Sequence, residues 1–341
     1  MEDKILKIED LCFSFKTYAG EVQAVRGVEL ELEKGESLGI VGESGCGKSV
    51  TAKSIIKLNP DDVGFYKRGS IHFDGKDILE LETKEMLKIR AKEIRMIFQD
   101  PMTSLNPTMK IGRQITEGIL NAYPKMKKAE AKEIAIKALK DTGIPCPEER
   151  YNQYPHQFSG GMRQRAMIAL ALAVNPKLLI CDEPTTALDV TLQAQILELI
   201  KDLQKKYDTS IIFITHDLGV VANIAKDIAV MYAGKVMEYG STSEIFYNCK
   251  HPYTWGVLQS IPKANADKSV PLVPIPGTPP DLFSPPIGCP FAARCAYAMD
   301  VCSKMVPPKY HMENKHYVNC WLYHDMAPKT INPITGKEVS L

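Results

Sequence analysis

Apolar residues in the earlier part of the chain fall into two alternating patterns. Short runs rich in Val, Ile and Leu predict buried strands, and stretches with a helical repeat of apolar positions separate them. The apolar runs are residues 37–42, 94–99, 177–183 and 210–217, and the clearest helical stretches are residues 127–142 and 191–207. This alternation predicts an α/β fold with buried parallel strands.

Other stretches depart from that alternation. Residues 5–15 and 25–36 mix apolar and charged positions, which predicts strands with one wetter face. Residues 230–240, "VMYAGKVMEYG", predict a hairpin that turns at Ala233-Gly234. Residues 270–290 are too rich in proline for a helix or a central strand and predict an extended linker. No internal repeat is visible, so a solenoid is not expected.

Composition narrows the class of protein. The chain has 341 residues, 45% apolar and 24% charged, which is ordinary for a soluble globular protein of about two domains. Its net charge of +1 gives no reason to expect a nucleic acid partner. The longest apolar run, residues 166–174, is far shorter than the roughly 20 residues that cross a bilayer.

The N-terminus and the cysteines indicate a compartment. The opening "MEDKILKIEDL" has no long apolar region typical of a signal peptide, so we expect a cytoplasmic location. Nine cysteines in a reducing compartment are poor candidates for disulfides, which leaves metal binding or buried thiols.

The strongest chemical signal is "GESGCGKS", Gly42 to Ser49, which matches G-x-x-x-x-G-K-[ST] between a predicted strand and a predicted helix. Its glycines let backbone N–H groups wrap phosphates, and the helix end and Lys48 balance their charge. Ser49 is the expected Mg²⁺ ligand, and Cys46 has no expected role of its own. The predicted nucleotide contacts are Gly42, Glu43, Ser44, Gly45, Cys46, Gly47, Lys48, Ser49 and Val50.

A pair of acidic residues follows a second apolar run, "LLICDEP", residues 178–184. Asp182 suits an indirect Mg²⁺ contact, and Glu183 suits the general base that polarises an attacking water. A solvent-exposed pair without a task is the alternative. Acids that end a buried strand favour the functional interpretation.

The sequence "FSGGMRQR", residues 158–165, resembles the signature of the ABC ATPases, which other P-loop proteins do not share. The resemblance implies an α/β P-loop core with an antiparallel β subdomain and a helical subdomain at about residues 100–165. It also implies that Ser159, Gly160 and Gly161 contact the γ-phosphate of ATP held by the opposite subunit. Met162 stands where the family usually has Gln, which leaves the Ser-Gly-Gly contacts intact.

Further residues match the family's motifs in order. Gln99 in "MIFQDP" matches the Q-loop, a Mg²⁺ and water contact near the groove for a membrane subunit. "ALD", residues 187–189, matches the D-loop, and His216 in "FITHD" matches the histidine that holds the γ-phosphate. Tyr18 is the expected aromatic that stacks on adenine, with Phe15 as the nearby alternative.

The later part of the chain resembles one branch of this family. "HPYTWGVLQSIP", residues 251–262, is similar to the C-terminal extension of ATPase subunits from dipeptide and oligopeptide importers. Cys289, Cys295, Cys302 and Cys320 follow with spacing C-x₅-C-x₆-C-x₁₇-C, which lacks the C-x₂₋₄-C knuckle usual for zinc. Several members of that branch carry such a quartet and bind a [4Fe–4S] cluster, and the resemblance implies one here. Zinc remains an alternative because three histidines lie nearby in the sequence. A third possibility is that the four cysteines are free buried thiols that bind no metal. These histidines are His311, His316 and His324.

The resemblance predicts an ATP-hydrolysing subunit of a dipeptide or oligopeptide importer at the cytoplasmic face of the membrane. We expect a nucleotide-binding domain at residues 1–250 and an extension at 251–341, with the cysteines folding the extension as a unit of its own. The implied partners are membrane-spanning permease subunits, a second ATPase subunit and, indirectly, an extracytoplasmic solute-binding protein. A nickel or other solute importer, and a soluble non-transport ABC protein, remain alternatives.

Overall fold

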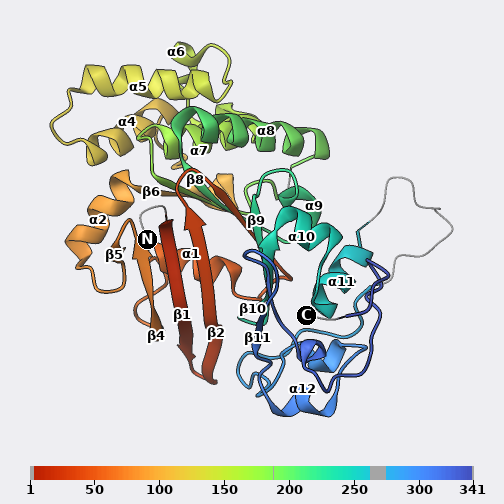
Figure 1. Ribbon diagram of the computed structural model, residues 1–341. Coiled ribbons are helices and arrows are strands. Elements are labelled where there is room, and N and C mark those ends of the chain that lie inside the picture. The colour runs from red at the N-terminus through yellow and green to blue at the C-terminus, as the bar shows by residue number, and fades with distance from the viewer. Residues whose placement is uncertain (1–3, 187, 262–273, 340–341) are drawn as a thin grey trace. The chain divides into compact units, whose positions relative to one another are not determined.

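The computed structural model describes residues 4–186, 188–261 and 274–339 (Figure 1). Contacts within the chain divide it into two compact units. The first unit comprises Met1–Leu6, Leu32–Ser37 and His72–Ile214, and the second comprises Lys7–Glu31, Leu38–Ile71 and Thr215–Leu341. In the part of the chain that is described, no helix is both long and apolar enough to cross a membrane.

Parallel strands form the centre of the first unit. β6 (Ile94–Ile97) pairs with β7 (Leu178–Asp182), and β7 pairs in parallel with β8 (Ser210–Thr215). All residues of β7 and β8 are buried, which explains why both read as continuous apolar runs. The predicted parallel strands are therefore confirmed here.

Helices make up most of the rest of the first unit. In α4 (Ile111–Ala122), Ile111, Ile115 and Ile119 are fully buried at helical spacing, and this apolar face fixes the helix against its neighbours. The predicted helices at residues 127–142 and 191–207 are confirmed as α5 (Lys128–Asp141) and α8 (Val190–Tyr207). Besides a short strand, β5 (Lys76–Asp77), the unit contains α2 (Thr83–Lys92), α3 (Pro101–Ser104), α4 (Ile111–Ala122), α5 (Lys128–Asp141), α6 (Pro147–Arg150), the 3₁₀ helix η1 (Pro155–Gln157), α7 (Gly160–Leu172) and α8 (Val190–Tyr207).

The second unit holds two groups of strands. In one, β1 (Lys4–Thr17) lies between β2 (Gly20–Glu33) and β4 (Gly64–Phe73). Val28 and Leu30 of β2 are buried while Glu29 is exposed, which confirms the predicted wetter face.

In the other group, β3 (Ser37–Val41) runs parallel to β9 (Asp227–Tyr232), and β9 and β10 (Lys235–Ser241) form an antiparallel hairpin. Tyr232 pairs with Lys235, so the turn lies at Ala233-Gly234 as predicted. The remaining elements of this unit are α1 (Lys48–Ile55), α9 (Leu218–Val221), α10 (Thr242–Tyr247), α11 (Pro252–Gln259), η2 (Ala292–Arg294), α12 (Asp300–Lys304), β11 (Lys309–His311), β12 (Tyr317–Asn319) and η3 (Trp321–Tyr323).

The C-terminal tail is built into the second unit. β12 pairs antiparallel with β10, with Val318 opposite Glu238, and β11 pairs with β12. The Arg26 guanidinium donates to the carbonyl oxygen of Pro286, a further link between tail and core. The tail strands therefore extend the sheet that contains β3, and the expectation that the tail folds as a unit of its own stays a prediction.

A buried contact between a histidine and a glutamate helps to hold the tail. His316 lies 2.9 Å from the Glu238 carboxylate, and both side chains are excluded from solvent. The same carboxylate accepts hydrogen bonds from the backbone N–H groups of Lys250 and His251. A buried acidic side chain with three polar partners is stable only while those partners remain.

We expect His316→Ala to lower the free energy of unfolding of this unit by about 3 kcal/mol, because it leaves the Glu238 carboxylate buried without its side-chain partner. Thermal melts followed by circular dichroism would measure the loss. His311→Ala is the matched control, since His311 lies on β11 and is exposed. Equal melting temperatures of His316→Ala and His311→Ala would contradict a structural role for the His316–Glu238 contact.

Candidate functional site

The loop between β3 and α1 depends on its glycines. Gly47 has a φ of 97°, and a Cβ there would lie 2.4 Å from the backbone oxygen of Ala24. A Cβ on Gly42 would lie 2.1 Å from the backbone oxygen of Met231. Neither contact is possible for a real side chain, so these positions require glycine. The loop can therefore wrap tightly in front of the first turn of α1.

Lys48 is held at the centre of this loop. Its ammonium donates to the carbonyl oxygens of Gly42, at 2.7 Å, and Glu43, at 2.9 Å. The side chain is buried, and a positive charge at a helix N-terminus favours an anion. Ser49 follows it in the first turn of α1, and Val50 comes next. This is the geometry expected of a phosphate-binding loop.

Cys46 of the same loop is a structural residue. Burial raises the pKa of its thiol, so the group stays protonated rather than becoming a reactive thiolate. The thiol fills space beside Gly42, where a Cβ would lie 2.8 Å from Cys46 Sγ. This agrees with the interpretation that Cys46 has no separate chemical role.

His216 and the phosphate-binding loop line the same pocket of the second unit. The pocket also includes a residue that the sequence did not single out, Tyr253 of α11. The Tyr253 hydroxyl accepts a hydrogen bond of 3.1 Å from the backbone N–H of Glu43. Because 210 residues separate these partners, no local pattern could have revealed the contact. The pocket residues include Gly42, Glu43, Ser44, His216 and Tyr253.

The predicted adenine-stacking residue occupies a turn. Tyr18 lies between β1 and β2 with a fully exposed ring. The alternative, Phe15, packs edge-on against Phe13, with ring centroids 5.0 Å apart. Phe15 therefore has a packing role, whereas the ring of Tyr18 is accessible to a base. Adenine stacking by Tyr18 stays a prediction.

The first unit gathers the acidic residues at the end of β7. Asp182 is the last residue of the strand and is buried. Glu183 follows with a φ of 47°, an uncommon conformation for a residue other than glycine. One Glu183 carboxylate oxygen accepts a hydrogen bond of 3.0 Å from Gln99 and another of 3.0 Å from Thr186. These donors fix the carboxylate in one orientation.

Thr186 was not predicted. Its hydroxyl reaches Glu183 because the turn after β7 brings residues 183 and 186 together, and the Thr186 N–H donates to the Glu183 carbonyl oxygen. A threonine three residues after an acid is the signal that could have revealed it. Of the predicted D-loop, Ala187 lies outside the described residues, while Asp189 caps α8 by accepting from the N–H of Leu192.

The signature residues begin α7. The Ser159 hydroxyl accepts from the N–H of Met162 at 3.3 Å and caps the helix. A Cβ on Gly161 would lie 2.8 Å from the Leu192 side chain, whereas one on Gly160 would meet nothing within 4 Å. Close packing against Leu192 thus explains why residue 161 is a glycine. The exposed helix start at Ser159 and Gly160 is open to a ligand, although their predicted γ-phosphate contact remains untested.

The four tail cysteines all belong to the second unit. Cys289, Cys302 and Cys320 are buried and Cys295 is half-buried. The N–H of Cys289 donates to the carbonyl oxygen of Cys302 at 2.7 Å, and burial raises the pKa values of Cys289 and Cys295 to about 11. Burial raises the pKa of the Cys320 thiol well above its usual value, and the other three cysteines raise it further.

These thiols do not form a single-ion site. Across residues 4–186, 188–261 and 274–339, no three or more His, Cys, Asp or Glu side chains are placed to hold one metal ion. The histidines suggested as replacement ligands have other roles: His316 pairs with Glu238, and His324 accepts a hydrogen bond from the N–H of Met326. His311 lines a pocket of the second unit that none of the four cysteines lines.

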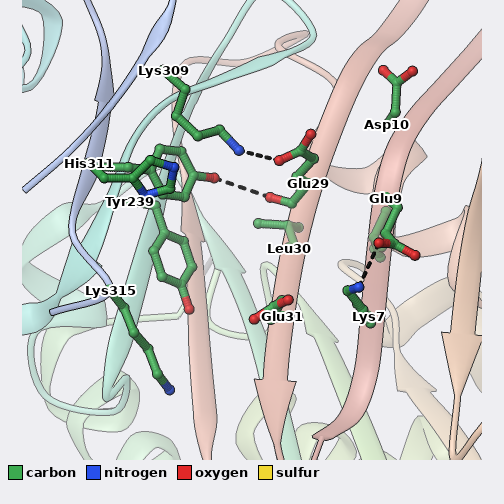
Figure 2. Close-up of a pocket in the computed structure, with 12 residues that line it drawn as sticks. Lys7, Glu9, Asp10, Glu29, Leu30, Glu31, Tyr239, Lys309, His311 and Lys315 are labelled. Atoms are coloured by element: carbon green, nitrogen blue, oxygen red, sulfur yellow. Dashed lines mark hydrogen bonds and ion pairs between the residues drawn. The ribbon is translucent and has the colours of Figure 1, made fainter. Parts of the chain in front are cut away.

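That pocket is a charged groove between β1, β2 and the tail strands (Figure 2). Four of its charged residues form two pairs: Lys7 lies 2.6 Å from Glu9, and Lys309 contacts Glu29. The Tyr317 hydroxyl donates to the carbonyl oxygen of Glu29. None of the predicted nucleotide contacts lines this groove, so it is separate from the phosphate-binding loop.

The two units therefore each contain part of the predicted site. The second unit brings the phosphate-binding loop and His216 to one pocket. The first unit brings Gln99 to Glu183 and presents Ser159 at the start of a helix.

Comparison with known families gives two matches. Residues 25–186 match the family model described as ABC transporter. Residues 237–302 match the model described as oligopeptide/dipeptide transporter, C-terminal region. The second match covers α11 and three of the four tail cysteines, so it includes the tail as well as the core.

Individual relatives are similar over nearly the whole chain. The oligopeptide transport ATP-binding protein OppD of Bacillus subtilis is 61% identical over 330 residues, covering 97% of this chain and 92% of the relative. The dipeptide transport ATP-binding protein DppD of the same organism is 55% identical, covering 96% and 98%.

Solved structures share the fold. A dimeric ATP-binding cassette, MJ0796 bound to ADP and Pi, has a TM-score of 0.62 and 28% identity, covering 70% of this chain and 98% of that one. The cbiO1 protein of Clostridium perfringens, part of an ABC transporter complex, has a TM-score of 0.62 and 31% identity, covering 72% and 91%.

Proposed function

The chain belongs to the ABC transporter ATP-binding subunits of the oligopeptide and dipeptide importer type, and we propose that it hydrolyses ATP to power the import of dipeptides or oligopeptides. The observation that carries the proposal is the match to the peptide transporter C-terminal region together with the ATPase core. A nickel or other solute importer would share the core, and a soluble ABC protein would need no such tail.

The phosphate-binding loop supplies the substrate contacts. Lys48 and the N–H groups of residues 42–47 would bind the β- and γ-phosphates of ATP. His216, which lines the same pocket, would hold the γ-phosphate, and Tyr18 would stack on adenine.

Glu183 would act as the general base. Its carboxylate, oriented by Gln99 and Thr186, accepts the proton of the attacking water. Bound Mg²⁺ would neutralise charge on the phosphates, and the oxygen ligands that suit this hard cation are Ser49, Gln99 and Asp182. Asp182 fits such a role because its carboxylate ends a buried strand.

We also propose that the subunit works as a peripheral protein at the cytoplasmic membrane face, with permease subunits and a second ATPase subunit. Dimeric cassettes among the similar structures support the pairing. In the dimer, Ser159, Gly160 and Gly161 would face the ATP of the opposite subunit. A solute-binding protein would act indirectly, through the permease.

Uptake of labelled peptide tests the transport function. Cells lacking this chain are expected to lose dipeptide or oligopeptide uptake and to regain it with the wild-type chain but not with Lys48→Ala, since Lys48 sits at the centre of the phosphate loop. Nickel uptake measured in the same cells is the control. Loss of nickel uptake with intact peptide uptake would contradict the peptide assignment.

We further propose that Cys289, Cys295, Cys302 and Cys320 hold a [4Fe–4S] cluster. Four thiols of the tail, one of them on the short helix α12 and the others outside helices and strands, fit this group. Zinc is the alternative. The cluster would supply cross-links between tail segments, and no redox chemistry is needed.

Cys295→Ser is expected to remove iron and brown colour from anaerobically purified protein and to expose the chain after about residue 285 to protease, because one thiolate link is lost. Iron and sulfide analysis and limited proteolysis measure both effects. Cys146→Ser is the matched control, since Cys146 is exposed and belongs to the first unit. Stoichiometric zinc without iron in the wild-type protein would overturn the cluster.

A further inference from the structure

We propose that Arg294 is a positioning residue for nucleotide binding, which holds the phosphate loop through Glu43 and thereby couples ATP affinity to the tail. The inference rests on the proposed binding of ATP at this loop. Arg294 belongs to η2, directly before Cys295, and Glu43 is 251 residues earlier in the chain.

The contact is a charge pair within the second unit. One Arg294 nitrogen, Nη1, donates to both oxygens of the Glu43 carboxylate, at 3.0 and 2.8 Å. The Arg294 side chain is only 7% exposed and that of Glu43 29% exposed. Such partly desolvated, charge-assisted hydrogen bonds are stronger than surface ion pairs.

All three nitrogens of the Arg294 guanidinium donate hydrogen bonds. Nη1 also donates to the Tyr232 hydroxyl at 3.1 Å, and the group lies 5.7 Å from the centre of the Tyr232 ring. Nε donates to the carbonyl oxygen of Pro276 at 2.8 Å, and Nη2 to that of Ile275 at 3.3 Å. Because these bonds set the plane of the guanidinium, Arg294 acts as a rigid anchor for Glu43.

Glu43 is held at three points. Arg294 binds its side chain, Tyr253 accepts from its N–H, and Lys48 donates to its carbonyl oxygen. Two of these partners belong to the region after β10, and the third is the lysine at the centre of the phosphate loop. Glu43 alone therefore connects Arg294 and Tyr253 to the phosphate-binding Lys48.

The charge of Glu43 explains why this matters for ATP. A carboxylate in a loop that binds a triphosphate repels its ligand unless a cation neutralises it. Arg294 neutralises the carboxylate and keeps the loop backbone in place. The phosphate-loop motif does not specify the residue at position 43. The motif alone therefore does not predict that a cation must neutralise a carboxylate there.

The same contact ties the loop to the tail. The Arg294 N–H donates to the carbonyl oxygen of Phe291, whose ring packs against Tyr232 and Tyr253 with centroids 5.4 and 5.3 Å away. A change in the tail that displaces η2 would withdraw the guanidinium from Glu43. ATP affinity should therefore respond to the state of the tail. A tail that is uncoupled from the phosphate loop would leave the affinity unchanged.

A charge-removal cycle in the purified full chain tests the proposal, with the Kd for MgATP and the KM and kcat of hydrolysis as readouts. Arg294→Met is expected to raise Kd and KM about five- to tenfold with little change in kcat, because it leaves an unpaired carboxylate beside the phosphates. Adding Glu43→Gln to Arg294→Met should return Kd to within about twofold of Glu43→Gln alone. A residue needed only for folding would show no such rescue.

Arg26→Met is the matched control. Arg26 also joins tail to core, through Pro286, but its side-chain bonds run to Pro286 and Ala233 rather than to the phosphate loop. It should leave Kd within about twofold of wild type. Equal weakening by Arg26→Met and Arg294→Met, or no rescue in the double variant, would overturn the coupling through Glu43. A wild-type chain that binds ATP no better than Lys48→Ala would overturn the proposed function, and this inference with it.

Discussion

Glu183→Gln is expected to bind ATP and to hydrolyse it at least about 100-fold more slowly than the wild type. The amide has nearly the shape of the carboxylate but cannot accept the proton of the attacking water. Asp182 and Lys48 are unchanged, so nucleotide affinity should persist and ATP should accumulate in closed dimers. Phosphate release and nucleotide binding, measured on the same preparation, separate the two effects.

Glu130→Gln is the matched control, because Glu130 is exposed on α5 of the same unit. It should keep wild-type turnover. Retention of more than about a tenth of wild-type activity by Glu183→Gln would remove Glu183 as the base, given the 100-fold minimum expected of general base catalysis.

The elements that carry the chemistry were predictable because their signals are local. The buried strand β7 is a continuous apolar run that ends in an acid, and the phosphate loop is defined by glycines at fixed spacing. The hairpin turn at Ala233-Gly234 follows from the same kind of short-range signal.

The contacts that were missed join distant parts of the chain. Arg294 and Glu43 are 251 residues apart, and His316 and Glu238 are 78 apart. Such pairs depend on how the tail packs, and neither spacing nor composition encodes that packing. The pairing of the tail with the core sheet was missed for the same reason: β12 is only three residues long, and its pairing with β10 leaves no trace in the sequence pattern.

The signature helix leads to the second large effect. Ser159→Arg is expected to leave ATP binding by the isolated subunit intact and to reduce turnover of the assembled dimer by about 100-fold or more, because a bulky cation at the exposed start of α7 would occupy the space of the partner's γ-phosphate. Filter binding on monomers and phosphate release on assembled dimers measure the two properties. Ser159→Thr is the conservative control, since its hydroxyl can still cap α7.

Mixing two defective subunits distinguishes a defect in the partner's site from one in the subunit's own site. Where the chain pairs with a copy of itself, a mixed dimer of Ser159→Arg and Lys48→Ala places both defects in one composite site and leaves the other site with an intact Lys48 and an intact Ser159. Activity should therefore reappear on mixing, although neither variant is active alone. Loss of ATP binding by the isolated Ser159→Arg subunit would show that the residue serves its own nucleotide, and the assignment across the dimer would then be wrong.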